Sequence, residues 1–302
     1  MIEYYFYRTV AFMSRLLPQR LAYWVGLRIS DQFYRHNHAG RAAVISNLRR
    51  VYAARGIVPA EDALQGLARK MFQYFGKYLV DFFRFARLSP EDVRKRVSLE
   101  HWEYLEQALQ RGRGALIVTA HIGNWEMGGA VLIALGHRMN ALVLPQRLEK
   151  LNRMFQRQRE LRGIRIIPVG QSGFSIIRCL RRGEIVAVLG DRDFTAKDDR
   201  VMFFGQPARI PRGPAWLAVR TGTPVVPAFL LRQVDDTFLL RVYPPIYPEE
   251  AGSEEALRDR VCRILEKEIG EQPFQWFIFD DFWAAGASPA GPLPAGHDRV
   301  GA

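Results

Sequence analysis

The 302-residue chain has little cysteine and no long uncharged apolar run. Its two cysteines, Cys179 and Cys262, lie in apolar stretches without paired or metal-type spacing, which indicates buried thiols in a reducing compartment. The longer uncharged stretches, such as residues 127–136, fall well short of the roughly 20 residues that a membrane-spanning helix needs. Residues 1–17 lack the basic region, continuous apolar core and cleavage site of a signal peptide. We therefore expect a chain that is soluble or lies on a membrane without crossing it.

Motifs for nucleotide cofactors and metal ions are also missing. The sequence contains no Walker A loop, no Gly-x-Gly-x-x-Gly fingerprint and no His-Glu-x-x-His motif. Five histidines stand at scattered positions without the spacing of a metal site, namely His36, His38, His101, His137 and His297. We therefore expect no metal ion and no nucleotide cofactor.

Acidic residues are outnumbered by basic ones. The chain has 43 Lys and Arg against 31 Asp and Glu, a formal net charge of +12. Such an excess attracts nucleic acid, anionic lipid headgroups or an acidic carrier protein, unless it serves solubility alone. A nucleic-acid-binding chain would interleave aromatic residues with Lys and Arg on one sheet face. Here the aromatic residues cluster in helical stretches near the N-terminus, so we expect no nucleic-acid partner and favour anionic membrane lipids.

The N-terminal segment is rich in aromatic and aliphatic residues. Arg8 and Arg15 lie seven positions apart in it and so nearly on one helical face. An aromatic-rich helix with a narrow basic stripe is typical of an anchor in the membrane interface, although a helix packed on the protein core would carry similar residues. Further helices are expected over residues 41–54 and 60–85, and the aromatic residues of the second indicate that it is buried.

From residue 98 onward, short β-rich runs alternate with helical stretches. Strands are expected over residues 115–120, 141–144, 164–169, 185–189, 225–231 and 237–242, and helices over 148–162, 175–182, 213–220 and 254–271. This alternation predicts an α/β fold with a mixed, largely parallel sheet flanked by helices. We expect an N-terminal helical, membrane-associating region over residues 1–97, an α/β core over 98–283 and a disordered tail over 284–302.

The sharpest local pattern is a His-x-x-x-x-Glu motif from His121 to Glu126. A strand would end just before His121, Gly123 would allow a tight turn, and Asn124 would cap a helix opening at Trp125. Both ionisable side chains would then lie at the carboxyl edge of a parallel sheet, where ligands bind in such folds.

A histidine held by a carboxylate can take a proton from a hydroxyl group, because the carboxylate fixes the ring tautomer and stabilises the imidazolium. A nucleophilic Ser or Cys is missing, since Gly170-Gln-Ser172-Gly is not a Gly-x-Ser-x-Gly elbow and neither cysteine lies in a reactive context. These features favour direct attack by a substrate hydroxyl or amine on an activated acyl group. A purely structural His–Glu pair is the alternative.

The His-Ile-Gly-Asn-Trp-Glu block is similar to the His-Phe-Gly-Asn-Trp-Glu block of the lipid A late acyltransferase family, which also includes phosphatidylinositol mannoside acyltransferases. Further blocks resemble those of the family in the same order: Gly190-Asp-Arg-Asp193, Phe203-Phe-Gly-Gln-Pro-Ala208, Leu217-Ala-Val-Arg-Thr-Gly-Thr-Pro-Val-Val-Pro227 and Gln275-Trp-Phe277. The resemblance covers residues 1–283, and the ordered set is more specific than any single block.

This resemblance implies a glycerolipid acyltransferase-like fold and transfer of a fatty acyl chain from acyl carrier protein or acyl-CoA to a hydroxyl of a glycolipid. It implies action at the cytoplasmic face of the inner membrane, with no cofactor beyond the thioester substrate. His121 would be the general base and Glu126 its orienting partner. The remaining candidates for substrate binding are Arg147, Arg159, Asp191, Asp193, Phe204, Gly205 and Arg209.

Three details refine these expectations. Asp191 and Asp193 could bind a divalent ion, but we favour hydrogen-bonding or arginine-pairing roles that shape the pocket. Arg209-Ile-Pro-Arg212 stands where the family often has Thr, and it resembles the mannoside acyltransferase branch or a more distant one. Asp280-Asp-Phe-Trp283 stands where lipid A enzymes often carry basic residues. The acceptor therefore stays open between a lipid A precursor, a phosphatidylinositol mannoside and an aryl-polyene-type lipid.

Overall fold

The computed structural model describes residues 2–85, 89–145, 148–170, 173–193 and 199–284. Its centre is a seven-stranded sheet in the order β1-β9-β8-β2-β5-β3-β4, and a separate β6–β7 hairpin lies outside it. The strands are β1 (Val97–Glu100), β2 (Ala115–Thr119), β3 (Met139–Val143), β4 (Arg165–Pro168), β5 (Ile185–Leu189), β6 (Val201–Phe203), β7 (Gln206–Ala208), β8 (Val225–Arg232) and β9 (Phe238–Val242).

Most strands of the sheet run in one direction. Strands β8, β2, β5, β3 and β4 are mutually parallel, β9 pairs antiparallel with β8, and β1 is parallel to β9. The expected α/β fold with a mixed, largely parallel sheet is confirmed.

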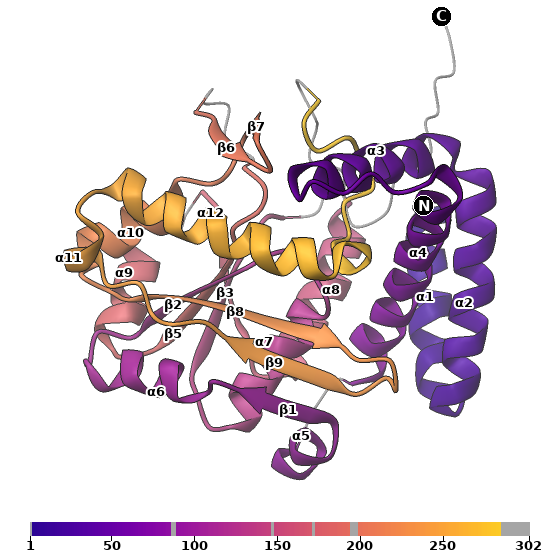
Figure 1. Cartoon of the computed structure of the whole chain (residues 1–302). Helices are drawn as coiled ribbons and strands as arrows, with labels where there is room; N and C mark the ends of the chain where they lie inside the picture. The colour runs from indigo at the N-terminus through magenta and orange to yellow at the C-terminus, as the bar shows by residue number, and fades with distance from the viewer. Residues whose placement is uncertain (1, 86–88, 146–147, 171–172, 194–198, 285–302) are drawn as a thin grey trace, which may run out of the picture.

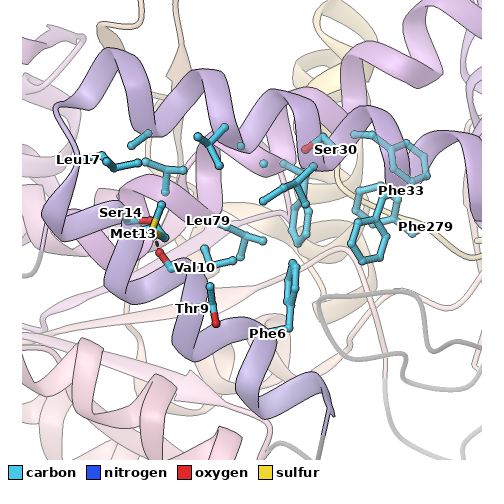
Figure 2. A pocket seen from close by; sticks show the side chains of 18 residues that line it. Phe6, Thr9, Val10, Met13, Ser14, Leu17, Ser30, Phe33, Leu79 and Phe279 are labelled. Carbon is cyan, nitrogen blue, oxygen red and sulfur yellow. Dashed lines mark hydrogen bonds between the residues drawn. The ribbon is translucent and has the colours of Figure 1, made fainter.

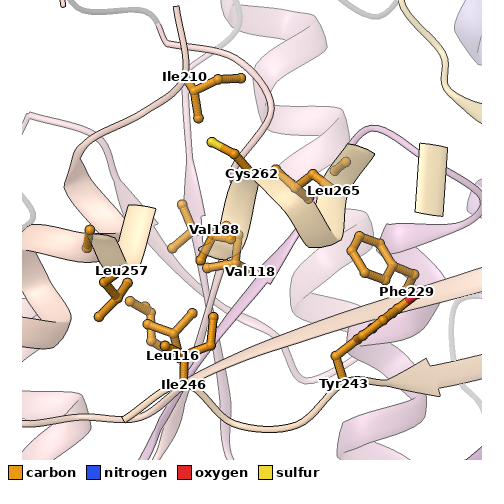
Figure 3. Close-up of a cluster of buried hydrophobic side chains, with 14 of the residues drawn as sticks. Leu116, Val118, Val188, Ile210, Phe229, Tyr243, Ile246, Leu257, Cys262 and Leu265 are labelled. Atoms are coloured by element: carbon orange, nitrogen blue, oxygen red, sulfur yellow. The ribbon is translucent and has the colours of Figure 1, made fainter. Parts of the chain in front are cut away.

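Helices cover both faces of this sheet (Figure 1). On one face, side chains of α9, α10 and α12 form a core with alternate strand residues such as Leu116 and Val118. Figure 3 shows part of this core, with Leu257 and Cys262 of α12. On the other face, α5, α6 and α7 pack against the intervening residues Ala115 and Ile117. Strand β2 is continuously apolar because its alternating side chains enter both cores. These helices are α5 (Pro90–Arg96), α6 (Glu103–Gln110), α7 (Trp125–Ala134), α9 (Gly173–Arg181), α10 (Gly213–Thr221), the short α11 (Pro248–Ala251), α12 (Glu254–Glu271) and the 3-10 turn η1 (Pro273–Gln275).

The N-terminal helices stand together at one end of the sheet, where Figure 1 draws them in indigo. They are α1 (Ile2–Leu16), α2 (Gln19–His36), α3 (His38–Ala54) and α4 (Glu61–Arg84), and α8 (Glu149–Leu161) also joins their core. That core is rich in aromatic side chains and includes Phe155 of α8 and Phe277. Arg232 of β8 also donates to the Asp81 carboxylate of α4, so the helical bundle and the sheet share side-chain contacts. The division near residue 97 stays a prediction, and the predicted disordered tail from residue 285 lies outside the described residues.

Among the helices that the structure describes, none has the length and the apolar character that crossing a bilayer requires.

Candidate active site

The site lies where two neighbouring parallel strands end. β2 and β5 pair in register through Thr119 and Leu189, so the residues that follow each strand meet at the carboxyl edge of the sheet. His121 and Asp191 are those residues. The Asp191 side chain is 0% exposed and that of His121 is 21% exposed, so the carboxylate is buried while the imidazole still reaches solvent. This edge is where parallel α/β sheets bind their ligands.

Asp191 holds both the backbone and the ring of His121. Its Oδ1 lies 2.9 Å from His121 Nδ1, and its Oδ2 accepts hydrogen bonds from the His121 backbone N–H at 3.0 Å and from Trp276 Nε1–H at 2.9 Å. Burial alone would raise the pKa of Asp191, but the charge of His121 and these hydrogen bonds lower it below its ordinary value. An ionised Asp191 fixes the proton on Nδ1 and leaves Nε2 to accept a proton.

The turn after His121 is fixed by the backbone of Gly123 and the side chain of Asn124. Gly123 adopts a positive φ of 62°, and a Cβ added there would collide with the backbone carbonyl of Leu230. Asn124 caps α7 as expected, because its Oδ1 accepts a hydrogen bond from the Met127 N–H at 3.1 Å. Its Nδ2 also donates to Asp81 of α4 at 3.3 Å, which ties the turn to the N-terminal helices.

Glu126 faces α8 and not the His121 ring. Nε of Arg159 lies 2.9 and 3.1 Å from the two carboxylate oxygens of Glu126, and Nη1 of Arg162 lies 3.9 Å from one of them. Burial alone would lower the pKa of Arg159, but contact with Glu126 raises it. The carboxylate on the imidazole is thus that of Asp191, whereas the spacing of the motif suggested Glu126. The difference arises because the first turn of α7 directs residue 126 toward the guanidinium groups of Arg159 and Arg162.

The other predicted binding residues fall into three situations. Asp193 and Arg209 are brought together, since the Asp193 N–H donates to the Arg209 carbonyl at 3.3 Å. Phe204 and Gly205 form the two-residue turn of the β6–β7 hairpin, both with positive φ. The Phe204 ring packs 6.5 Å from the Trp276 ring, which joins the hairpin to the site. Arg147 lies outside the described residues. Substrate contact by these residues stays a prediction.

The sequence did not reveal that Trp276 contacts Asp191, nor that β2 and β5 are paired and so bring His121 and Asp191 together. Asp191 was expected to shape the pocket, but its partner His121 lies 70 positions away in the chain. The signal that could have linked them is the position of both residues directly after buried apolar runs. Which runs are neighbours in the sheet, however, depends on the crossover topology, and apolar periodicity does not report it.

Aromatic rings lead from His121 toward a cavity among the N-terminal helices. The Trp125 ring lies edge-on to His121 at 5.3 Å and stacks on Tyr78 at 4.5 Å, and Tyr78 in turn stacks on Phe75. Phe75 lines an apolar cavity of about 140 Å³ between α1, α2 and α4. Figure 2 shows side chains from these helices, among them Val10 and Leu79, pointing into it.

The chain is similar in sequence to known proteins over most of its length. A family model described as bacterial lipid A biosynthesis acyltransferase matches residues 1–284. A phosphatidylinositol mannoside acyltransferase of Mycolicibacterium smegmatis is 26% identical over 91% of this chain and 90% of its own. Its counterpart from Mycobacterium tuberculosis is 28% identical over 91% of this chain and 86% of its own.

Among solved structures, the 1-acyl-sn-glycerophosphate acyltransferase PlsC from Thermotoga maritima is similar over 86% of this chain and 99% of its own, with 15% identity and a TM-score of 0.40. The family model spans nearly all of the described residues and includes the strand ends that carry His121 and Asp191. This chain therefore belongs to the bacterial lipid A biosynthesis acyltransferase family and is an acyltransferase.

Proposed function

We propose that the protein transfers a fatty acyl group from an acyl thioester to a hydroxyl group of a glycolipid, with His121 as the general base and Asp191 as the carboxylate that orients it. The observation that carries this proposal is the 2.9 Å contact between His121 Nδ1 and buried Asp191 at the carboxyl edge of the sheet. A histidine so oriented, with a side chain that is still 21% exposed, suits proton abstraction from a bound hydroxyl.

The reaction proceeds by direct transfer. His121 Nε2 takes the proton of the acceptor hydroxyl while its oxygen attacks the thioester carbonyl carbon. The tetrahedral intermediate then collapses, the carbon–sulfur bond breaks, and the leaving thiolate takes the proton back from the imidazolium. Asp191 stays ionised throughout and stabilises the imidazolium.

The cysteines support a mechanism without an acyl-enzyme. Both Cys179 and Cys262 are buried, and burial raises the pKa of each thiol, that of Cys262 to about 12. A thiol with a raised pKa carries little thiolate near neutral pH and is a poor nucleophile.

Glu126 has a positioning role in this proposal. It forms an ion pair with Arg159, lies 3.9 Å from Arg162 and so ties α8 to α7. Arg159 is 11% exposed and could still turn one face toward the substrate, as the family resemblance suggested.

The donor's acyl chain would lie along the aromatic side chains beside His121 and end in the cavity between α1, α2 and α4. A cavity of about 150 Å³ is large enough for benzene, so one of about 140 Å³ takes only the end of a fatty chain unless α1 and α2 move apart. Its lining is almost entirely apolar, which suits a hydrocarbon and not a headgroup.

We propose that α1 and α2 bind the cytoplasmic face of the inner membrane. Apolar side chains of both helices are exposed, with Phe12 at 63% and Trp24 at 54%. Arg8, Arg15 and Arg28 lie on the same helices and would face anionic headgroups. Both substrates of a lipid acyltransferase are amphipathic, so a site beside the membrane surface shortens the path of each.

Three acceptors and two donors remain within this proposal, and an aryl-polyene-type lipid is the third acceptor. The family description favours a lipid A precursor, while the names of the mycobacterial relatives favour a phosphatidylinositol mannoside. The net charge of +12 would speed the encounter with an acidic acyl carrier protein, and it would also attract the phosphate groups of acyl-CoA, so both donors stay within the proposal.

The test is a lipid profile by mass spectrometry of cells that lack the gene, carry it, or carry the His121→Ala variant. We expect one glycolipid to gain one acyl mass only with the wild-type protein. Purified protein and the identified acceptor would then distinguish acyl carrier protein from acyl-CoA as donor. Identical glycolipid profiles in all three strains would contradict a glycolipid acceptor, and wild-type turnover by His121→Ala would contradict the mechanism.

A further inference from the structure

A short segment after α12 lies directly against the catalytic turn. The Gly123 N–H donates to the Gln275 carbonyl at 3.0 Å, and the Phe277 N–H donates to the His121 carbonyl at 2.7 Å. Between them, Ile122 and Trp276 form an antiparallel bridge. Residues 275–277 thus act as a short backbone partner for the loop that carries His121.

This segment is itself anchored to the end of β8. The side-chain amide of Gln275 pairs with the backbone of Arg232 in both directions, since its Oε1 accepts from the Arg232 N–H at 3.0 Å and its Nε2 donates to the Arg232 carbonyl at 2.9 Å. Gln275 is buried, so these hydrogen bonds are shielded from water. The segment is therefore rigid, and it fixes the position of the side chains that it carries.

The side chain that it holds is the indole of Trp276. Trp276 is 1% exposed, and its Nε1–H donates to Asp191 Oδ2 at 2.9 Å. The same oxygen accepts the His121 backbone N–H, while the other oxygen faces the His121 ring. Two donors on Oδ2 fix the plane of the carboxylate and decide which oxygen is presented to the imidazole.

We propose that Trp276 is a positioning residue for acyl transfer, which acts by locking the Asp191 carboxylate in the orientation that holds the His121 ring. The inference rests on the proposed role of Asp191. Loss of the indole N–H leaves Oδ2 with one donor fewer in a site closed to water, so the carboxylate turns to recover a partner. The His121 ring, which depends on Oδ1, then loses its fixed orientation.

The test replaces Trp276 with Phe, which removes the N–H and keeps an aromatic ring. We expect kcat to fall by about tenfold or more with KM for both substrates nearly unchanged, because ring orientation matters in the reaction and not in substrate binding. The matched control is Trp283→Phe. Trp283 belongs to the same aromatic cluster, 6.1 Å from the Trp276 ring, but its N–H donates at 3.3 Å to the backbone carbonyl of Phe203.

A second replacement separates the hydrogen bond from packing. Incorporation of 3-benzothienylalanine at position 276 keeps the size of indole but replaces the N–H with sulfur, and it should reproduce the loss of kcat even if Trp276→Phe folds poorly. In an Asp191→Asn background the Trp276→Phe effect should shrink, since the two changes act on one contact. Wild-type kcat with the benzothienyl residue, or full additivity with Asp191→Asn, would overturn the inference.

A readout without turnover keeps this inference separate from the proposed function. In protein labelled with ¹⁵N-histidine, the Nδ1–H signal of His121 should shift in Trp276→Phe and stay in place in Trp283→Phe. A shifted signal in a protein that acylates no glycolipid would refute the proposed function and leave the positioning role standing. An unshifted signal together with active wild-type enzyme would refute the positioning role alone.

Discussion

Two carboxylates lie near the turn that carries His121, and their surroundings differ. Asp191 contacts one imidazole ring and two neutral N–H donors, whereas Glu126 contacts two guanidinium groups. A carboxylate between N–H donors and a histidine can stabilise a charge that appears on the ring during the reaction. A carboxylate shared by two arginines already balances permanent charges, so its removal affects the fold first.

The first prediction concerns Asp191→Asn. An amide there keeps the shape but cannot stabilise an imidazolium, and it allows the wrong ring tautomer. We expect kcat to fall by about 10²- to 10⁴-fold with little change in the melting temperature. Steady-state kinetics at saturating donor measure it. Turnover within threefold of wild type would mean that another group orients His121.

The second prediction concerns Glu126→Gln. The change leaves Arg159 and Arg162 in the interior without a counter-charge, and removing one partner of a buried ion pair costs roughly 3–5 kcal/mol. We expect the free energy of unfolding in urea to drop by about that amount, with lower activity following from lower stability.

The Glu126→Gln/Arg159→Met double variant is the control for this prediction, because it removes charge on both sides and should regain part of the lost stability. An unchanged unfolding free energy together with collapsed activity would support instead the His121–Glu126 dyad that the motif suggested.

At the scale of secondary structure, long patterned segments were predicted well. Helix α12 has the predicted bounds, Glu254–Glu271, and β5 coincides with the predicted run at residues 185–189. Strand β3 begins at Met139, two residues before the predicted run, because Arg138 and Asn140 interrupt the apolar pattern.

Short elements were missed. Strand β1 (Val97–Glu100) has two exposed residues and owes its existence to pairing with β9, which is distant in the sequence. Its four residues form one short, half-buried run, and a run of that length does not distinguish a strand from a coil. The same limit applies to the site. His121 was found because its motif is local, and its contact with Asp191 was missed because it depends on which strands are neighbours.

The third prediction concerns the cavity between α1, α2 and α4. Val10→Phe would fill part of its volume from α1 (Figure 2). If the cavity receives the end of the donor's acyl chain, the variant should prefer shorter chains than wild type, because a filled cavity admits fewer methylene groups.

Competition between acyl thioesters of different lengths measures that preference. Tyr5→Trp, which adds a larger ring at an exposed position of the same helix, is the matched control and should leave the preference unchanged. An identical chain-length preference in Val10→Phe and wild type would show that the fatty chain binds elsewhere.

At the scale of the whole molecule, the edge of the sheet that carries His121 is connected to the N-terminal helices that expose apolar side chains. The carboxyl edge of the sheet, which carries His121, meets α4 of the N-terminal bundle through the Asn124–Asp81 and Trp125–Tyr78 contacts. Helices α1 and α2, which expose Phe12 and Trp24, pack against α4 and are joined through it to this edge of the sheet. A membrane bound by α1 and α2 would deliver lipid substrates near His121.

The fourth prediction follows from that arrangement. Phe12→Glu combined with Trp24→Glu puts charge at two exposed apolar positions and should reduce binding to anionic phospholipid vesicles by at least about tenfold. Vesicle sedimentation measures it. The control is Val219→Glu on α10, a similarly exposed apolar residue that lies outside the N-terminal helices.

Salt separates the two contributions to this binding. The Debye length falls from about 10 Å at 0.1 M salt to about 3 Å at 1 M, so the attraction between the +12 chain and anionic lipid should largely disappear at high salt. The apolar contribution of Phe12 and Trp24 persists there, because burying apolar surface does not depend on screening. We therefore expect wild-type protein in 1 M salt to keep weak binding that the double variant lacks. Equal binding by both proteins at every salt concentration would mean that charge alone recruits the chain and that α1 and α2 do not enter the membrane interface.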